Sequence, residues 1–265
     1  MTRFASCWSA PASGLVLVLV LAAAAPARGD ELISTDRPDF TNSSDVVGRG
    51  RWQIETSVGA ERDSSSGQRV RTVNTPTLLR YGVSDSFELR LDGAGAVHQT
   101  SFDPAGSAST SERGRAPLGA GFKWHLPNGA GLLFDAGIDG GSGAFRERGL
   151  RASLNVPFAV DPGWGDDWSL GLMPGLFVDR NDDRQRYYGG IASASLGHDW
   201  GGWHAFTELA AQRIARQRDG GSVLTFDIGG AWRTAAVQLD SALAFGVNRN
   251  APHVALTVGF SIRFD

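Results

Sequence analysis

The side chains most able to do chemistry in this sequence are a few histidines, one cysteine and many carboxylates. The histidines are His98, His125, His198, His204 and His253. Their spacing matches no metal-ligand set and no nucleophile motif, and no Gly-x-Ser-x-Gly stretch occurs in the chain. Cys7 precedes an apolar run near the N-terminus, so it has no disulfide partner and no lipid-attachment context. We therefore predict that the protein is not an enzyme and has no metal site and no cofactor.

Charged residues recur at alternate positions inside apolar segments. Glu88 and Arg90 alternate with Phe87, Leu89 and Leu91, which is the period of a β-strand with one apolar and one charged face. If the apolar face contacts lipid, the charged face lines an interior. This alternation places ten charged residues in the interior of the predicted barrel: Glu55, Glu88, Arg90, Asp92, Lys123, Asp135, Asp139, Arg151, Asp227 and Asp240. These residues form either a network of opposite charges that neutralise one another in a narrow barrel or the lining of a conduit.

The same period of two extends from residue 51 to the end of the chain. It is clear at residues 51–63, 87–97, 118–126, 132–138, 150–158, 168–178, 224–232, 237–247 and 254–264, and less clear at 71–81, 187–200 and 203–213. The count is about twelve, and an even number lets antiparallel up-and-down strands close without an unpaired edge. Alternation alone also fits a secreted soluble β-sandwich or a lipocalin-like barrel. Strand number and the charge on the second face favour an all-β transmembrane barrel.

The N-terminus has the features of a secretory signal peptide. Arg3 precedes the apolar run 15–21, and an Ala25-x-Ala27 cleavage pattern follows it. We predict a signal peptide at residues 1–27, with cleavage after Gly29 as the alternative. No later stretch has the roughly 18 consecutive apolar residues of a membrane helix, so a helical bundle is excluded. The net charge of −3 does not indicate the positively charged surface that nucleic acid binding needs.

The connections between the expected strands alternate in length. Short turns lie at 83–85, 127–129, 201–202 and 233–236, and longer polar connections at 98–115, 140–149, 179–186 and 213–221, with 161–167 as an exception among the short ones. Short periplasmic turns and long extracellular loops are typical of outer-membrane barrels. Every tryptophan beyond Trp8 falls at the short-turn end of an expected strand or in a short turn, where its ring suits the membrane interface. We expect this end to be periplasmic.

The run Ile33-Ser34-Thr35-Asp36-Arg37-Pro38-Asp39-Phe40-Thr41 resembles the entry motif of the outer-membrane family called "Putative MetA-pathway of phenol degradation". The resemblance continues through Val46-Val47-Gly48, Gln53-Ile54-Glu55, Leu78-Leu79-Arg80-Tyr81-Gly82-Val83 and Phe87-Glu88-Leu89-Arg90-Leu91. It implies an outer-membrane barrel with a transport role, and its register adds Arg80 and Glu208 to the interior residues. The implied partners are outer-membrane lipid and the barrel-assembly machinery. Phe264 resembles the aromatic C-terminal end of such barrels, whereas Asp265 departs from it.

The segment 28–50, between the leader and the first strand, has two interpretations. It is a polar linker in which Pro38 holds an extended shape and keeps Arg37 out of the helical region. Alternatively, Asp36, Arg37, Pro38 and Asp39 enter the interior as a plug, in which Arg37 and the two carboxylates pair with Arg80, Glu88 or Arg90. We favour the plug, because the segment carries both charges and apolar residues that an interior can bind.

Together these patterns predict a transmembrane antiparallel up-and-down β-barrel of about twelve strands over residues 51–265. We expect an outer-membrane channel that passes small, aromatic or otherwise apolar, molecules through a charged and partly plugged lumen. The aromatic cargo comes from the family's name alone. The alternative is a closed barrel with a structural or surface-interaction role, presenting the 98–115 connection outwards. Conductance separates the two.

Overall fold

The computed structural model describes residues 32–64, 69–103, 106–180, 185–215 and 221–265. The predicted signal peptide at 1–27 lies outside these residues. Almost all regular structure is strand, apart from one short 3-10 helix at Gly143–Phe145. Among the described residues, no helix has the length and apolarity that a membrane crossing needs.

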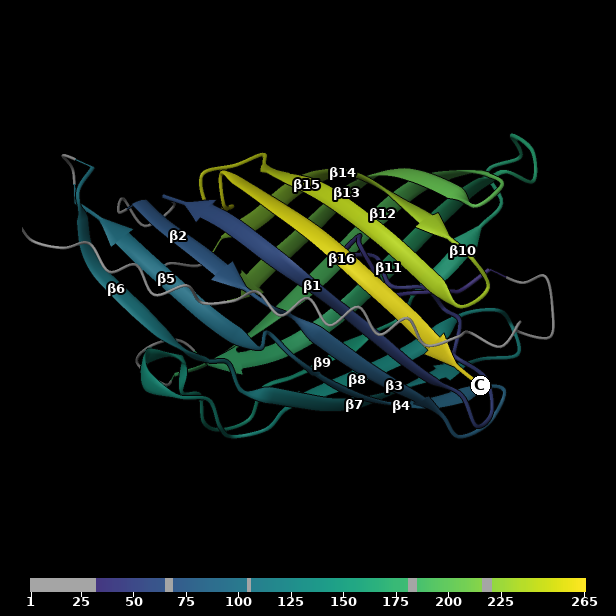
Figure 1. Cartoon of the computed structure of the whole chain (residues 1–265), viewed down its shortest axis with the longest axis horizontal. Coiled ribbons are helices and arrows are strands. Elements are labelled where there is room, and N and C mark those ends of the chain that lie inside the picture. The colour runs from purple at the N-terminus through teal and green to yellow at the C-terminus, as the bar shows by residue number, and fades with distance from the viewer. Residues whose placement is uncertain (1–31, 65–68, 104–105, 181–184, 216–220) are drawn as a thin grey trace, which may run out of the picture.

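The described strands close into an antiparallel barrel of twelve positions, because β1 pairs with the full length of β16 (Figure 1). Eight positions hold one strand each: β1 (Trp52–Asp63), β8 (Gly131–Gly137), β11 (Trp168–Arg180), β12 (Arg186–Trp200), β13 (Trp203–Ala215), β14 (Ser222–Arg233), β15 (Val237–Gly246) and β16 (Val254–Phe264). The other four positions each hold two strands end to end: β3 (Thr77–Gly82) with β2 (Arg69–Asn74), β4 (Phe87–Gly93) with β5 (Ala96–Phe102), β7 (Leu118–His125) with β6 (Ala108–Arg115), and β9 (Ala152–Asn155) with β10 (Phe158–Val160). The predicted fold class is therefore confirmed.

The four broken positions have local causes. Pro76, Pro117 and Pro157 lie at three of the breaks, and proline has no N–H to donate to a strand ladder. At the fourth break, Gly95 has a φ of +64°, and a Cβ there would clash with the carbonyl of Thr75. The expected strand 71–81 is therefore interrupted. Beyond the breaks, β2, β5 and β6 continue the wall beside Gly59–Asp63 of β1 and form an extension of the barrel.

The predicted long connection at 98–115 is wrong. Most of this stretch is strand, in β5 and β6, and the backbone N–H of Asp103 after β5 donates to the carbonyl of Ser107 before β6. Almost every side chain of β6 is exposed, so neither of its faces needed apolar residues and no alternation marked it as a strand. The polar composition indicated exposure to water and was mistaken for the absence of regular structure.

The apolar and polar faces of the wall are the reverse of those in a soluble protein. Leu176 and Val258 are 68% and 56% exposed, whereas Arg80 and Lys123 are fully buried. A water-soluble barrel or sandwich would bury the former and expose the latter. The soluble alternative is therefore wrong, and the outer face suits a hydrocarbon environment.

Tryptophans gather at one end of the barrel, which we call the tryptophan end. Trp203 pairs with Trp200 on one side and Trp232 on the other, and Trp52 pairs with Phe264. The ring centroids of Trp52 and Tyr81 are 4.4 Å apart. The opposite end, where β1 meets β2 and β5 meets β6, is called the loop end below.

Residues 32–50, called the inner segment, lie within the barrel rather than outside it (Figure 1). Ile33 donates its backbone N–H to Thr234 at the tryptophan end, and Gly50 donates to Gly82 at the same end. Between these points Ile33 and Val47 are almost fully buried. The segment thus enters and leaves the barrel at one end and occupies the half of the interior nearest to it.

Candidate functional site

The charged residues of β1, β3, β4 and β7 converge on one part of the interior, which we call the charged wall. Its members are Glu55, Arg80, Glu88, Arg90 and Lys123. Arg80 lies directly opposite Arg90, and Glu88 directly opposite Lys123, in the strand register. Because neighbouring strands place directly opposite residues on the same face, the alternation seen in sequence becomes a compact patch of mixed charge.

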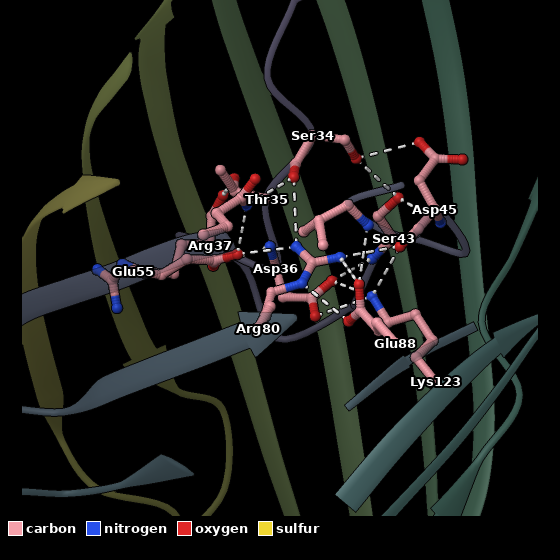
Figure 2. Close-up of polar contacts among 12 residues, drawn as sticks. Ser34, Thr35, Asp36, Arg37, Ser43, Asp45, Glu55, Arg80, Glu88 and Lys123 are labelled. Atoms are coloured by element: carbon pink, nitrogen blue, oxygen red, sulfur yellow. Dashed lines mark hydrogen bonds and ion pairs between the residues drawn. The ribbon is translucent and has the colours of Figure 1, made fainter. Parts of the chain in front are cut away.

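Asp36 of the inner segment is held by two cations of the charged wall. Lys123 Nζ lies 2.6 and 2.8 Å from the two Asp36 carboxylate oxygens (Figure 2). Arg90 Nη1 lies 2.5 Å from one of the same oxygens. Burial raises the pKa of Asp36, but the charges of Lys123, Arg80 and Arg90 outweigh burial and hold it well below its usual value. Asp36 is therefore a carboxylate over the whole physiological range.

Arg80 uses all five of its N–H donors, three within the charged wall and two on the inner segment. It donates to Glu88 through Nε and Nη2, at 2.8 and 3.0 Å, and to Glu55 through Nη1 at 2.8 Å. It also donates to the backbone carbonyls of Ser34 and Asp45, at 3.2 and 2.9 Å (Figure 2). A guanidinium has five N–H groups, so this buried cation is fully satisfied only while the inner segment is in place.

A second wall, on β15 and β16, binds the next residues of the inner segment. Arg37 Nη2 lies 3.1 Å from Asp240 and 2.9 Å from the Thr257 hydroxyl. Gln238 donates its side-chain amide to the Arg37 carbonyl at 3.0 Å and to Asp240 at 3.1 Å. Arg37 is thus directed away from the charged wall. A plug residue paired with Glu88 would point toward that wall instead.

A third wall, on β12 and β13, contacts residues 39–41 of the inner segment. Glu208 accepts hydrogen bonds from the backbone N–H groups of Phe40 and Thr41, both at 2.7 Å, and from the Thr41 hydroxyl. Asp39 accepts a hydrogen bond from Ser195 at 3.0 Å. Burial and the negative charge of Glu208 raise the pKa of Asp39 to about 7.

The structure brings most of the predicted interior residues together around the inner segment. Glu55, Arg80, Glu88, Arg90, Lys123, Glu208 and Asp240 all contact it directly. Asp135 and Asp227 lie in the wall without such a contact: Asp135 is 3.6 Å from Arg90, and Asp227 lies directly opposite Glu208. Asp139 is a correction, because β8 ends at Gly137 and Asp139 lies exposed in the following loop, where it accepts a hydrogen bond from the Gly149 N–H.

Several uncharged residues bind the inner segment and were missed in the sequence analysis. They are Gln53, Gln238, Ser193 and Ser195. Gln53 and Gln238 each lie two positions before an interior carboxylate, Glu55 and Asp240, so their strand parity was the available signal. Charge alone was too narrow a criterion for interior residues.

Cavities remain in the interior beyond the inner segment. One of about 410 Å³ lies between β4, β7, β8, β9 and β11, and its lining includes Asp135, Arg151 and Phe177. Another, of about 260 Å³, is lined by Asp36, Arg37 and Arg90 among others. Both share the lining residues Asp92, Gly93 and Ala94, so they adjoin. Within the described ranges, no group of three or more His, Cys, Asp or Glu side chains is arranged to hold a metal ion.

Comparison with known families and structures agrees with this architecture. The family model described as "Putative MetA-pathway of phenol degradation" matches residues 35–264. The fold is similar to that of an outer membrane channel from Pseudomonas putida F1, with a TM-score of 0.61 and 13% identity over 86% of this chain and 99% of the other. It is also similar to the translocator domain of the autotransporter NalP from Neisseria meningitidis, with a TM-score of 0.55 and 14% identity over 82% of this chain and 89% of the other. No curated protein sequence matches the chain.

Proposed function

The chain belongs to the family described as "Putative MetA-pathway of phenol degradation" and forms a β-barrel of the outer membrane, and from this premise we propose that it is a channel for small, aromatic or otherwise apolar, molecules. The proposed route runs through the barrel interior. In this proposal, residues 1–27 are the cleaved leader, residues 28–50 carry the plug, and residues 51–265 form the barrel wall.

The observation that carries the proposal is the division of the interior along its length. The inner segment fills the half near the tryptophan end, and adjoining cavities of about 410 and 260 Å³ lie against it and beyond it. Twelve strands enclose more space than the eight that side chains alone can fill. A barrel of this size therefore has room for a solute once the inner segment moves.

The inner segment is proposed to be the plug of this channel. Its contacts with the three walls are hydrogen bonds and ion pairs rather than a continuous apolar core. Polar contacts of this kind can be exchanged for water, so a segment held by them can leave a water-accessible lumen at moderate cost. A purely structural segment would be better held by apolar packing.

The proposed cargo class draws on the family's description and on the cavity lining. Phe177 lines the larger cavity, and its ring centroid lies 6.0 Å from that of Tyr187 at near-perpendicular geometry. Gly119 and Gly137 line the same cavity on the inward face of β7 and β8, in register with Asp92. Aromatic edges and small apolar groups, set beside a few charges, form a lining that accepts a small aromatic solute with a polar substituent.

The proposed orientation places the tryptophan end in the periplasm and the loop end outside the cell. The tryptophan rings then lie at the inner interface of the membrane. The polar extension of β2, β5 and β6 lies at the opposite end, where outer-membrane barrels carry their larger extracellular parts. The plug accordingly closes the channel from the periplasmic side.

Single-channel recording on the purified barrel in planar bilayers tests the proposal. The comparison is between the wild type and a deletion of Leu32 to Ser44, which removes the residues bound to all three walls. We expect the deletion to raise both the conductance and the leakage of small solutes from proteoliposomes. The matched control is Asp45→Asn, an exposed change in the inner segment, which should leave conductance unchanged.

One outcome of this recording would contradict the proposal. If the wild type and the deletion are both silent while both migrate as closed barrels in unboiled gels, the interior is closed for reasons other than the plug. The barrel would then have a structural or surface-interaction role without transport.

A further inference from the structure

A groove lies on the outer surface of the barrel near the loop end. It has a volume of about 410 Å³, and its lining includes Ala60 and Arg62 of β1, Arg69 and Arg71 of β2, and Leu256 of β16. Figure 1 shows β16, β1, β2 and β5 side by side, in that order, on the face toward the viewer. The groove is separate from the interior cavities and lies on the side of the wall that faces lipid.

The strand register fixes the side on which the three arginines lie. Arg62 is directly opposite Arg71 on one side and Val254 on the other. Two residues further along, Ala60 is opposite Leu256, which is 44% exposed on the lipid-facing surface. Directly opposite residues share a face, so Arg62 and Arg71 are on the outer face with Leu256. Arg69, two residues from Arg71, is on the same face.

These arginines are not balanced by carboxylates. Arg62 and Arg71 lie side by side, which costs free energy because like charges repel when directly opposite in a sheet. Within the described ranges, none of the ion pairs involves Arg62, Arg69 or Arg71. Glu61 also lines the groove, but Glu61 and Asp63 have the opposite parity to Arg62 along β1.

The apolar part of the groove lies on the membrane side of the arginines. From Arg62 the outer face of β1 continues through Ala60 to Val58, and that of β16 continues from Val254 through Leu256 to Val258. The small side chain of Ala60 leaves a channel between larger neighbours. Cationic groups at the end of such a channel match a lipid with an anionic headgroup and an extended acyl chain.

We propose that this groove is a binding site for a phosphorylated glycolipid of the outer leaflet, with Arg62, Arg69 and Arg71 on its phosphates and Ala60 and Leu256 against an acyl chain. Arginine suits this ligand because its planar fork donates two parallel hydrogen bonds to a phosphate. The proposal rests on the orientation given under "Proposed function", since only that orientation brings the groove to the outer leaflet. It does not depend on whether the interior conducts.

Binding of diphosphoryl lipid A to the detergent-solubilised barrel, measured by native mass spectrometry, tests the site. The variant Arg62→Ser/Arg71→Ser should bind at least tenfold more weakly than the wild type, because two cations near the headgroup are lost. The control Arg49→Ser/Arg249→Ser removes the same charge from exposed positions outside the groove and should leave affinity unchanged. A gel shift between boiled and unboiled samples confirms that each variant is a closed barrel.

Further arms separate the glycolipid from other anions. Dephosphorylated lipid A should bind weakly to the wild type, and millimolar inorganic phosphate should not displace diphosphoryl lipid A, because the acyl chain contributes to binding. Equal loss of affinity in both double variants would overturn the proposal. So would equal affinity for phosphatidylglycerol with the same dependence on Arg62 and Arg71, or full displacement by inorganic phosphate. Labelling of a cysteine at Ser107 decides the orientation separately, so a failure of orientation is distinguishable from a failure of binding.

Discussion

Lys123 on β7 holds both carboxylate oxygens of Asp36 in the inner segment, at 2.6 and 2.8 Å, and both side chains are shielded from solvent. The two residues are far apart in sequence, so this ion pair joins the N-terminal segment to the wall of the barrel. A buried ion pair is costly to break on one side only, because the remaining charge stays buried without compensation. The inner segment is therefore coupled to the charged wall through Asp36.

Replacing Lys123 with methionine is expected to loosen the inner segment. The change leaves Asp36 with Arg90 as its closest cation and costs about 3–5 kcal/mol of segment binding, as for other buried pairs that lose one partner. Limited chymotrypsin digestion of the detergent-solubilised barrel measures this, because the Phe40–Thr41 bond, whose flanking N–H groups are bound to Glu208, becomes accessible when the segment leaves. Cleavage after Phe40 should be faster in Lys123→Met than in the wild type and in the control Asp45→Asn. Equal cleavage rates in all three proteins would show that the pair does not hold the segment.

The pH dependence of conductance should report on Asp39. Its pKa in the inserted segment is about 7, against an ordinary value of 3.8. Between these values a released segment has lost the Asp39 proton and an inserted one still carries it, so rising pH favours release. Conductance should therefore increase from pH 5 to pH 8.

The groups around Asp39 define the control for this pH dependence. Glu208 and Ser195 lie closest, Asp36 is the neighbouring carboxylate of the segment, and Asp227 lies beside Glu208. Asp39→Asn removes the titrating proton and keeps a side chain that can bind Ser195, so its conductance should change far less between pH 5 and pH 8. A pH dependence equal to that of the wild type would assign the effect to another group.

Cysteine labelling on intact cells should report the orientation. A cysteine at Ser107, exposed between β5 and β6, should react with a membrane-impermeant maleimide. A cysteine at Asn128, exposed in the turn between β7 and β8 at the tryptophan end, should react only after the outer membrane is permeabilised. The reverse pattern would invert the proposed topology and place the plug at the cell surface.

The alternation of side chains was enough to predict most of the wall. Wherever a strand separates lipid from a polar interior, as at Phe87 to Leu91, its two faces differ in chemistry and the period of two is visible. The signal failed in β6, because both of its faces are exposed and polar. It also misplaced Asp139, since the parity of β8 was extended past Gly137, where the strand ends.

The charges of the inner segment were predicted to enter the interior, but their partners were not all identified. Asp36 meets Arg90 in the way the sequence suggested, whereas Arg37 binds Asp240 on a different wall. Which wall a residue reaches depends on how the barrel closes, and closure pairs β1 with β16 from opposite ends of the chain. Strand parity gives the face of a residue and not its position around the barrel.

A disulfide between the inner segment and the wall tests most directly whether this segment gates the channel. The hydroxyl oxygens of Thr41 and Ser193 are 2.7 Å apart, so the sulfurs of two cysteines at these positions would lie close together, and the sequence has no cysteine after Cys7. In single-channel recordings of Thr41→Cys/Ser193→Cys, conductance should be lowest when the pair is oxidised and should rise to the wild-type level after reduction. Conductance that is the same before and after reduction, with the disulfide verified by mass spectrometry, would contradict a gating role for the inner segment.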